Sequence, residues 1–377
     1  MDRLHALKRL PWLLIVAAAA LTAIGYLAIA RTEALAGSDR QFARQQLLWA
    51  GIGVVAAIAT FTLPNYRVLM RHSYPLLVVA NVCLVAVYLF PPINGAHRWI
   101  RVYGFGFQPS EFAKFAFVLA LARYLMYRES YRRMLGLLVP LGLAFIPMVL
   151  ILREPDLGTA LIFLPVLFVM LFAAGARPRH LSLAALTAVA LLPALWSQMS
   201  LEQRSRITAL AEQPMPGQKV SDDAFHLHRA KQVLALGGIY GSAIHGELTE
   251  DRSAYYVPEA HTDSVFSIVG ERLGVVGLAV VLLLYVVLIA RVLAVAQNTY
   301  EPYGRLLAVG IASMLGVQVI INTGMMVGLL PITGLALPLV SYGGSSFMAT
   351  AVALGLVLNI GMRQSCEVSP EPFQFSD

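Results

Sequence analysis

Long apolar segments alternate with short polar segments along almost the whole chain. Each apolar segment approaches the roughly 17 to 25 residues that a helix needs to cross a bilayer. In lipid such a segment must be helical, because unpaired backbone N–H and C=O groups are too costly there. The pattern therefore predicts an all-α polytopic membrane protein with ten transmembrane helices. These spans lie near residues 12–30, 46–64, 75–92, 110–127, 134–152, 159–175, 180–198, 264–293, 305–328 and 340–361.

The composition supports the same class. Of the 377 residues, 58% are hydrophobic and only 13% are charged, whereas about 25% are charged in an ordinary soluble domain. The first span follows three basic residues, Arg3, Lys8 and Arg9, and so resembles a signal peptide. Its apolar stretch is longer than the roughly 7 to 15 residues of a signal-peptide core. We interpret it as an uncleaved helix.

Arginine and lysine are unevenly distributed between the two sides of the predicted bundle. Because short cytoplasmic loops carry an excess of these residues, the bias favours a cytoplasmic N-terminus and a cytoplasmic tail at 364–377. That side then holds Arg67, Arg71, Arg128, Arg132, Arg133, Arg177, Arg179, Arg291, Arg305 and Arg363. The net charge of +7 is mostly a signal of topology, and no nucleic-acid partner is expected. Cys83 within a span and Cys366 in the tail predict no disulfide.

One connection, residues 199–262 between the seventh and eighth spans, is far more polar than the others and faces outside in this topology. Loops of this length are usually functional or disordered. The apolar rhythm from Phe225 to Leu236 predicts a short helix near the membrane surface. No separate soluble domain is evident, so residues 1–377 are interpreted as one transmembrane domain.

The segment Pro258-Glu-Ala-His-Thr-Asp263 leads directly into the eighth span. Thr262 is the predicted N-cap of this helix, which places Asp263 in its first turn at the outer surface. Asp263 is then either a capping acid or a general base. The second reading is favoured because Glu259 and His261 are near, and because the head group of an amphiphilic substrate would lie at this depth. The spacing matches no metal-ligand signature.

The connection between the third and fourth spans carries several cations. Arg98, Arg101 and Lys114 are candidate donors to an anionic head group such as pyrophosphate. Trp99 is a candidate interfacial wedge, although aromatic belts also place tryptophan at this depth. An ion pair between Lys114 and Glu111 within the helix is equally expected.

Other polar residues near the outer ends of the spans have both structural and functional readings. Ser110 and Asp156 are predicted to cap the fourth and sixth spans. Under the alternative reading, Glu154 and Asp156 hold a substrate or a cation. Glu271 and Arg272 lie two turns into the eighth span, where charges usually face the bundle interior and pair. Structural pairing is the first interpretation, and lining a polar cleft is the second.

The segment 330–346 interrupts the last hydrophobic hairpin with two prolines and several glycines. Irregular backbone at membrane depth is tolerated where it lines a cavity or is buried in protein. We expect a shaped re-entrant turn here, with Ser341 as a candidate substrate-binding residue. Gly237-Gly-Ile-Tyr-Gly241 lacks the ending of a P-loop and is interpreted as a flexible loop.

Five motifs, taken in order along the chain, resemble the signatures of the SEDS family, which contains RodA, FtsW and SpoVE. They are Gly95-Ala-His-Arg-Trp-Ile100, Gln108-Pro-Ser-Glu111, Glu154-Pro-Asp-Leu-Gly-Thr159, Glu259-Ala-His-Thr-Asp263 and Leu337-Pro-Leu-Val-Ser-Tyr-Gly-Gly-Ser-Ser346. The resemblance runs from the first span to the last. The short N-terminus and Ile332-Thr333-Gly334 are more similar to the elongation member, RodA, than to the division member.

The resemblance implies a ten-helix peptidoglycan glycosyltransferase that polymerises lipid II, an undecaprenyl-pyrophosphate-linked disaccharide-peptide. It implies that the work is done at the outer face of the bacterial cytoplasmic membrane, with membrane lipids around the helices. Asp263 is then the catalytic acid–base, and Arg98 and Trp99 match a motif required for family activity. The implied partner is a class B penicillin-binding protein, which supplies the transpeptidase.

Our leading hypothesis from the sequence is glycosyl transfer between lipid-linked disaccharides, with Asp263 as the base. Arg98, Arg101 and Lys114 stabilise the leaving pyrophosphate. The other candidate substrate-binding residues are Trp99, Glu111, Glu154, Asp156, His261 and Ser341. No protein metal site is predicted, and a divalent cation, Mg²⁺ or Mn²⁺, is an open alternative. A lipid II flippase or transporter and a non-catalytic cell-wall scaffold are the rival functions.

The chain also departs from the family pattern. Arg229-Ala230 replaces Gln-Ser in the large loop, and Ala235-Leu-Gly-Gly238 replaces Gly-Ser-Gly-Gly. Ser264 replaces the usual Phe after the aspartate, and Arg272 replaces the second Glu of Glu-Glu-Leu-Gly. These changes affect the substrate contacts expected of the loop and any acidic cluster built on the second Glu.

Overall fold

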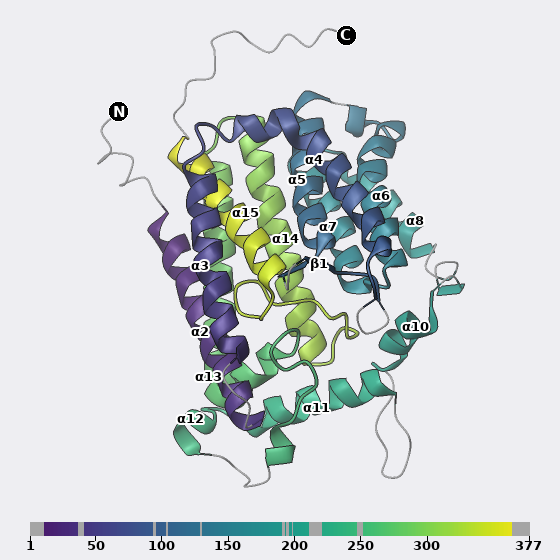
Figure 1. The fold of residues 1–377 in the computed structure, drawn as a ribbon. Helices are drawn as coiled ribbons and strands as arrows, with labels where there is room; N and C mark the ends of the chain where they lie inside the picture. Colours follow the sequence, from purple (N-terminus) through teal and green to yellow (C-terminus); the bar gives the residue numbers. More distant parts are fainter. Residues whose placement is uncertain are drawn as a thin grey trace.

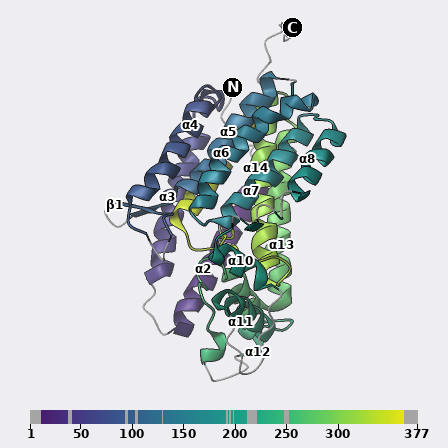
Figure 2. The ribbon, with the colours of Figure 1, turned by 90° about the vertical axis from the view of Figure 1, so that its right-hand side faces the viewer.

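The computed structural model is a bundle of long helices with one small hairpin (Figure 1; Figure 2). It describes residues 11–363 except 37–40, 93–95, 103–104, 129, 191–192, 194–195, 198, 211–220 and 247–251. The longer helices are α2 (Trp12–Ala36), α3 (Gln41–Phe61), α4 (Arg67–Ala86), α5 (Pro109–Tyr127), α6 (Leu138–Arg153), α7 (Leu157–Ala173), α8 (Pro178–Ala190), α11 (Asp222–Leu236), α13 (Val265–Gln297), α14 (Pro302–Met326) and α15 (Gly344–Met362). The shorter elements are η1 (Val87–Leu89), β1 (Ile100–Val102), β2 (Phe105–Phe107), η2 (Ser130–Arg132), η3 (Leu135–Leu137), α10 (Leu201–Thr208), α12 (Ser242–His245) and η4 (Arg252–Tyr255).

The helices share one continuous apolar core. α15 packs against α3, and α13 packs against both α2 and α14. α5 lies between α4, α7 and α14 and is buried along most of its length. By contrast, α3 and α4 bury only a few side chains and expose many valines and leucines. Exposed apolar faces of this kind suit helices that contact lipid, where no hydrophobic penalty opposes them.

Among the residues that the structure describes, seven helices are long and apolar enough to cross a membrane. They correspond to the first three predicted spans, the fifth, and the last three. The fourth predicted span is α5, which carries three charged residues, and the sixth is α7, which has only 17 residues. α8, in the region of the seventh, has 13, and part of that region is not described. The helical membrane fold is confirmed, whereas the count of ten stays a prediction.

α13 is 33 residues long and is interrupted at Gly274, whose φ of 68° is left-handed. An unbroken helix of that length would span about 50 Å, more than the roughly 30 Å of the hydrocarbon core. The part after Gly274 is sufficient to cross it, so Arg272 lies near the outer surface with its side chain exposed. The expectation that Arg272 faces the interior is therefore wrong. Glu271 is fully buried and pairs with Arg31 at 3.0 Å, as expected of a charge in the bundle.

The outer connection gathers α11 and α12 beyond one end of the bundle (Figure 1; Figure 2). α11 confirms the helix predicted from Phe225 to Leu236. Ala230 and Val233 are fully buried where α11 packs on α13. A Cβ at Gly237 would lie 1.9 Å from the Gly270 carbonyl oxygen, so only glycine permits this approach.

The loop after α11 joins the interruption of α13 directly. The amides of Val275 and Val276 donate to the carbonyls of Gly238 and Ile239 at 3.0 and 3.2 Å. A Cβ at Gly274 would lie 2.3 Å from the Ile239 carbonyl oxygen. Gly237 and Gly241 of this loop therefore serve close backbone contact with α13, which corrects the interpretation of the segment as a flexible loop.

The described chain begins and ends on the same side of the bundle. Pro11, just before α2, lies beside Gly361 near the end of α15, 3.9 Å from where a Cβ would stand. The start of α2 and the end of α15 also lie near one another, in the upper part of the view in Figure 1. A chain that starts and ends on one side crosses the membrane an even number of times.

Candidate active site

Asp263 lies in a turn ahead of α13 rather than in the first turn of that helix. The helix begins at Val265 with Ser264 in the N-cap position. Thr262 donates from its hydroxyl to the Glu259 carboxylate at 3.0 Å, and its amide donates to the Glu259 carbonyl. Because this turn engages the Thr262 side chain, the prediction of a Thr262 cap is wrong. No hydrogen bond from the helix amides ties the Asp263 carboxylate to the start of α13 in the described residues.

The Asp263 carboxylate is buried, only 5% exposed, and has few partners. The Ser264 hydroxyl donates to Oδ1 at a long 3.3 Å, and His226 Nε2 lies 4.0 Å from the same oxygen. Burial raises the pKa of Asp263 to about 7, and the negative charge of Glu259 acts in the same direction. A general base is most effective when its pKa lies near the working pH. Asp263 is therefore suited to accept a proton from a bound hydroxyl group.

Asn322 in α14 fixes the backbone of this site. Its side-chain amide donates to the Asp263 carbonyl at 2.8 Å and to the Leu335 carbonyl at 2.6 Å. Leu335 belongs to residues 331–343, which run without helix between α14 and α15 and are largely buried. The expected irregular segment is confirmed, and one buried amide holds it to the aspartate.

His261 and Ser341 also belong to this contact. His261 stacks on Phe42 with ring centroids 4.2 Å apart, and its carbonyl accepts from the Tyr342 amide at 2.8 Å. The buried Ser341 hydroxyl accepts from the Leu337 amide at 2.8 Å. Both side chains therefore brace the turn ahead of α13 and the segment 331–343. Their assignment as substrate-binding residues stays a prediction.

Glu154 and Asp156 lie in the short connection from α6 to α7. Asp156 is the N-cap of α7, as predicted, and accepts from the Thr159 amide and hydroxyl at 3.1 and 2.8 Å. Gln108 also donates to it at 3.4 Å. Glu154 is fully buried, and neither carboxylate oxygen has a hydrogen-bond partner among the described residues. Burial, then the charge of Asp156, raises the pKa of Glu154 to about 8.

Lys114 and Glu111 form the predicted ion pair one turn into α5, at 2.9 Å and almost completely buried. Gln108 occupies the N-cap position of α5 and Pro109 is its first residue, because proline is well accommodated there. The prediction that Ser110 caps this helix is therefore wrong. Its hydroxyl is buried without a partner in the described part of the chain.

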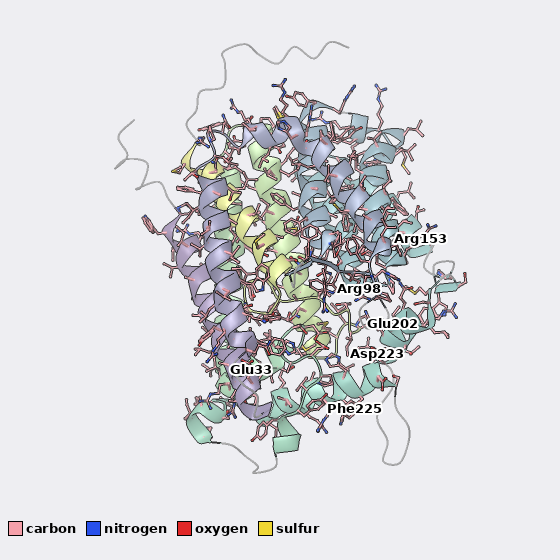
Figure 3. The ribbon with its side chains drawn as sticks, in the orientation of Figure 1. Glu33, Arg98, Arg153, Glu202, Asp223 and Phe225 are labelled. Atoms are coloured by element: carbon pink, nitrogen blue, oxygen red, sulfur yellow. The ribbon has the colours of Figure 1, made fainter. Side chains whose placement is uncertain are left out.

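Arg98 is held by the backbone of the α6–α7 connection. Its guanidinium donates to the backbone carbonyls of Glu154 at 2.9 Å and of Pro155. Arg101 is exposed on β1, which pairs antiparallel with β2. Arg98 lies at the level of this hairpin, and Asp223 and Phe225 on α11 lie below it (Figure 3). Arg98 thus ties the segment ahead of the hairpin to the α6–α7 connection, and the common role of the three cations stays a prediction.

The β1–β2 hairpin contacts the start of α15. The Trp99 ring lies beside Gly106 of the hairpin. Ser345 at the start of α15 donates to the Gly106 carbonyl and accepts from the Gln108 amide, both at 3.1 Å. Gly158, two residues after Asp156, approaches Thr333 so closely that a Cβ would collide with its carbonyl. The segment 331–343 therefore connects the Asp156 side of the site to the Asp263 side.

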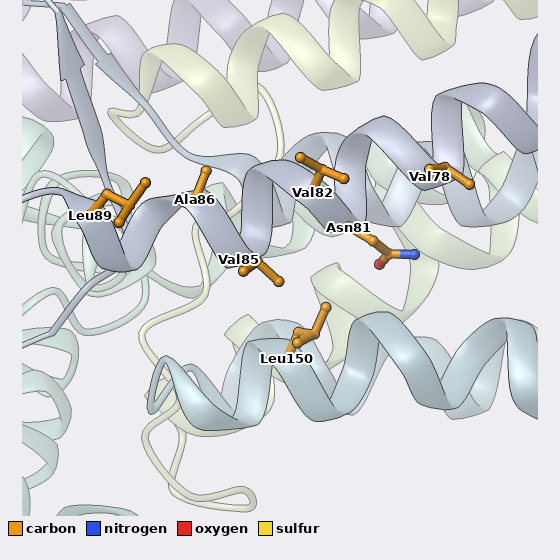
Figure 4. Close-up of a pocket in the computed structure, with 7 residues that line it drawn as sticks. All are labelled: Val78, Asn81, Val82, Val85, Ala86, Leu89 and Leu150. Atoms are coloured by element: carbon orange, nitrogen blue, oxygen red, sulfur yellow. The ribbon is translucent and has the colours of Figure 1, made fainter.

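An apolar groove of about 590 Å³ lies between α4 and α6, on the outside of the bundle (Figure 4). Its lining residues are Val78, Asn81, Val82, Val85, Ala86, Leu89 and Leu150. Leu89 ends the helical stretch that precedes Arg98, so the groove leads toward the hairpin side of the site.

The sequence pattern did not single out several residues that build the site. His226 contacts Ser264 from 38 positions away, and Asn322 reaches Asp263 from 59 positions away. A polar residue within an apolar helix, such as Asn322, was the available signal. The hairpin was also missed, although Ile100 to Phe107 alternates and contains glycine.

A family model described as "Cell cycle protein", covering FtsW, RodA and SpoVE, matches residues 8–366. The chain belongs to the FtsW/RodA/SpoVE family. The family resemblance inferred from the five motifs is thereby confirmed.

Two curated relatives of this family share the same percentage identity with the chain, over different lengths. One is the probable peptidoglycan glycosyltransferase FtsW of Geobacter sulfurreducens, 34% identical over 95% of this chain and 96% of its own. The other is the peptidoglycan glycosyltransferase MrdB of Escherichia coli, 34% identical over 86% of each chain. A solved FtsW/RodA/SpoVE-like chain, described under "Structural coordination of polymerization and crosslinking by a peptidoglycan synthase complex", has a TM-score of 0.80. It is 33% identical and covers 95% of this chain and 99% of its own.

Proposed function

We propose that this protein is a peptidoglycan glycosyltransferase that polymerises lipid II into glycan strands at the outer face of the cytoplasmic membrane. The observation that carries the proposal is Asp263, a buried carboxylate that is left without a structural task. Its family context and its raised pKa, about 7, favour catalysis over capping. A structural acid in the same position would hold the helix amides, as Asp156 does at α7.

In the proposed reaction Asp263 removes the proton from the attacking sugar hydroxyl of one lipid II. The oxygen forms a bond to the anomeric carbon of the second substrate as the bond to the pyrophosphate oxygen breaks. The electron pair leaves with the polyprenyl pyrophosphate. Arg98, Arg101 and Lys114 are the candidates to stabilise the leaving group. Since Lys114 is held by Glu111 and Arg98 by backbone carbonyls, both need little further ordering to act.

A divalent cation is the alternative partner of the pyrophosphate. Among the described residues, no group of three or more histidine, cysteine, aspartate or glutamate side chains comes together. Asp156 already accepts from Thr159 and Gln108, and the raised pKa of Glu154 favours its neutral form. These acids alone do not make a resident metal site, so each step above is assigned to protein side chains.

The groove between α4 and α6 supports a lipid-linked substrate. Apart from Asn81 it is lined by valine, alanine and leucine side chains, and it opens on the outside of the bundle. We assign it to the polyprenyl tail, whose sugar end would then lie toward Arg98. The match of apolar tail and apolar groove explains why a sugar polymerase would have a membrane scaffold.

We assign both termini to the cytoplasm, on the distribution of arginines and the shared side of Pro11 and Gly361. A class B penicillin-binding protein is the proposed partner, supported by the similar chain in a peptidoglycan synthase complex. Cell elongation is the proposed role, resting on Ile332-Thr333-Gly334. Equal similarity to FtsW and to MrdB leaves division as the competing role. Depletion of the protein from cells distinguishes the two roles, since loss of elongation gives round cells and loss of division gives filaments.

The decisive experiment is polymerisation by purified protein from lipid II, with and without the partner. Asp263→Asn is expected to lose at least about a hundredfold in rate, the usual contribution of a general base. Asp222→Asn, which changes an exposed acid of the same outer loop, is the matched control and should retain the rate. Both variants should elute as monodisperse protein and bind lipid II.

Two outcomes contradict the proposal. Normal polymerisation by Asp263→Asn would remove the catalytic assignment. Movement of lipid II across liposomes without any polymer would favour a flippase.

A further inference from the structure

Three buried polar side chains from two parts of the chain form a row ending at Asp263. His226 on α11 contacts Ser264 Oγ through Nε2 at 2.7 Å, and the same Oγ lies 3.3 Å from Asp263 Oδ1. His226 is 9% exposed, Asp263 is 5% exposed and Ser264 is fully buried. A buried hydroxyl between a histidine and a carboxylate has one hydrogen and two competing acceptors.

The shorter contact decides where that hydrogen is held when Asp263 is ionised and the imidazole is neutral. A second hydrogen bond joins the imidazole to the Pro258 backbone. We assign Nδ1–H to this carbonyl, so that Nε2 is the acceptor. Ser264 then donates to His226, and Asp263 receives little help from it. This explains why the aspartate is a stronger base than a well-capped carboxylate.

We propose that His226, acting through Ser264, holds the proton that Asp263 removes from the sugar hydroxyl. The inference rests on the proposed glycosyl transfer. Once Asp263 is protonated, its O–H donates to Ser264 Oγ, and the Ser264 hydrogen moves to His226 Nε2. Two O–H bonds break, while an N–H bond and a new Ser264 O–H bond form. Asp263 is ionised again, and His226 is an imidazolium that loses its proton to solvent. His226 and Ser264 are positioning residues, since neither is assigned a contact with substrate.

α11 is held firmly enough to keep His226 in place. Ala230 and Val233, one and two turns further along the same helix, are fully buried against the bundle, and Gly237 abuts the Gly270 backbone. At the other end of α11, Ser221 caps the helix through the Ala224 amide. The distance from His226 to Ser264 is therefore set by packing between two helices rather than by a loose loop.

The charged surroundings of His226 favour a neutral ring that can still gain a proton. Burial lowers the pKa of His226, and Arg206 on α10 acts in the same direction. Glu259 in the turn ahead of α13, Asp223 on α11 and the Pro258 backbone hydrogen bond oppose these effects. Near neutral pH the ring is thus uncharged before proton transfer, and the acids around it favour the imidazolium afterwards.

The test uses the full-length protein with its partner and compares pH–rate profiles for lipid II polymerisation. His226→Gln keeps a hydrogen-bonding side chain but cannot gain the proton. His228→Gln is the matched control on the same helix, where the histidine contacts Gln232 on the exposed side. Ser264→Ala removes the bridge, and Ser264→Thr restores a hydroxyl.

His226→Gln is expected to lower kcat by at least about tenfold while KM stays within about twofold, because proton handling rather than binding is lost. In the wild type the plot of log kcat against pH approaches a slope of two at low pH, since Asp263 and His226 must both be unprotonated. In His226→Gln this slope falls to one. Ser264→Ala gives the same change, Ser264→Thr recovers it, and His228→Gln matches the wild type.

A His226→Gln enzyme with wild-type kcat and slope would overturn the relay. A rise in KM with an unchanged kcat would also overturn it, because that result indicates a structural role. If Asp263→Asn is inactive while His226→Gln is normal, the relay fails and the proposed function stands. If Asp263→Asn is fully active, the catalytic role of Asp263 fails and the relay fails with it. If the wild type makes no polymer from lipid II, the proposed function itself fails.

Discussion

Asp156 and Asp263 each lie next to the start of a helix at the outer end of the bundle, yet they differ in nearly every interaction. Asp156 accepts three hydrogen bonds, two of them from Thr159, and its helix starts with that cap. Asp263 stands one residue further from its helix, behind Ser264, and accepts one long bond. Position relative to the helix, more than burial, thus separates an acid that caps its helix from one that does not, since both are about 95% buried.

The pH dependence of polymerisation should show the largest effect after loss of Asp263 itself. The base is active when ionised, and its pKa is raised to about 7. The wild-type rate should therefore be highest above pH 7 and fall at least about tenfold per unit below it. An ordinary aspartate would lose activity only near pH 4. A flat profile between pH 5 and 8 would contradict the raised pKa of Asp263.

Asn322→Leu should lower the rate without changing the Asp263 carboxylate itself, because Asn322 holds the backbone of the site. The change leaves the Asp263 and Leu335 carbonyls unsatisfied, and a shift of the loop by about 1 Å can cost tenfold or more in rate. We expect about a tenfold lower kcat with the low-pH midpoint altered. Thr323→Val is the control, because its hydroxyl donates to Val319 within the same helix. Equal rates for the two variants would contradict a role for Asn322.

Asp156→Ala should act mainly on stability. Loss of an N-cap costs about 1 kcal/mol, so the melting temperature should fall while the rate changes only a few-fold. Asp156→Asn keeps an acceptor oxygen and should restore most of that loss. If Asp156→Asn instead abolishes activity in a stable protein, the charge of Asp156 is needed for substrate or cation.

Glu154→Gln should have the smallest effect on the rate, within about twofold at pH 7, because Glu154 is mostly neutral below its pKa of about 8. The folded-state pKa is above the unfolded value of 4.5, so the wild type loses stability as the pH rises from 4.5 to 8. Glutamine does not titrate. The variant should match the wild type at pH 4.5 and melt higher at pH 8. The reverse order would show that Glu154 is ionised and paired.

Local sequence patterns predicted the features that depend on neighbours in the chain. The long helices, the Lys114–Glu111 pair and the Asp156 cap all follow from spacings of three to four residues or from apolar runs. Asp263 itself was identified through a motif, and it lies ahead of the helix rather than in its first turn. Its catalytic role stays a proposal.

Contacts between distant segments could not be predicted in the same way. Arg31 and Glu271 are 240 positions apart, and nothing in either segment identifies the other. The Thr262 cap failed because a Glu259 turn competes for the same hydroxyl, a choice that the pattern alone does not reveal. The reach of His226 and Asn322 depends on how α11 and α14 pack, which is a property of the folded bundle.

The interruption of α13 at Gly274 has a consequence for how the outer part of the protein moves. The amides of Val275 and Val276 donate to the loop after α11. These amides should therefore exchange with deuterium slowly, unlike those at a hinge open to water. The break joins the loop to the helix by backbone hydrogen bonds. α11 and the segment carrying Asp263 should therefore tilt together, and the distance between His226 and Asp263 should stay the same while sugar chains pass.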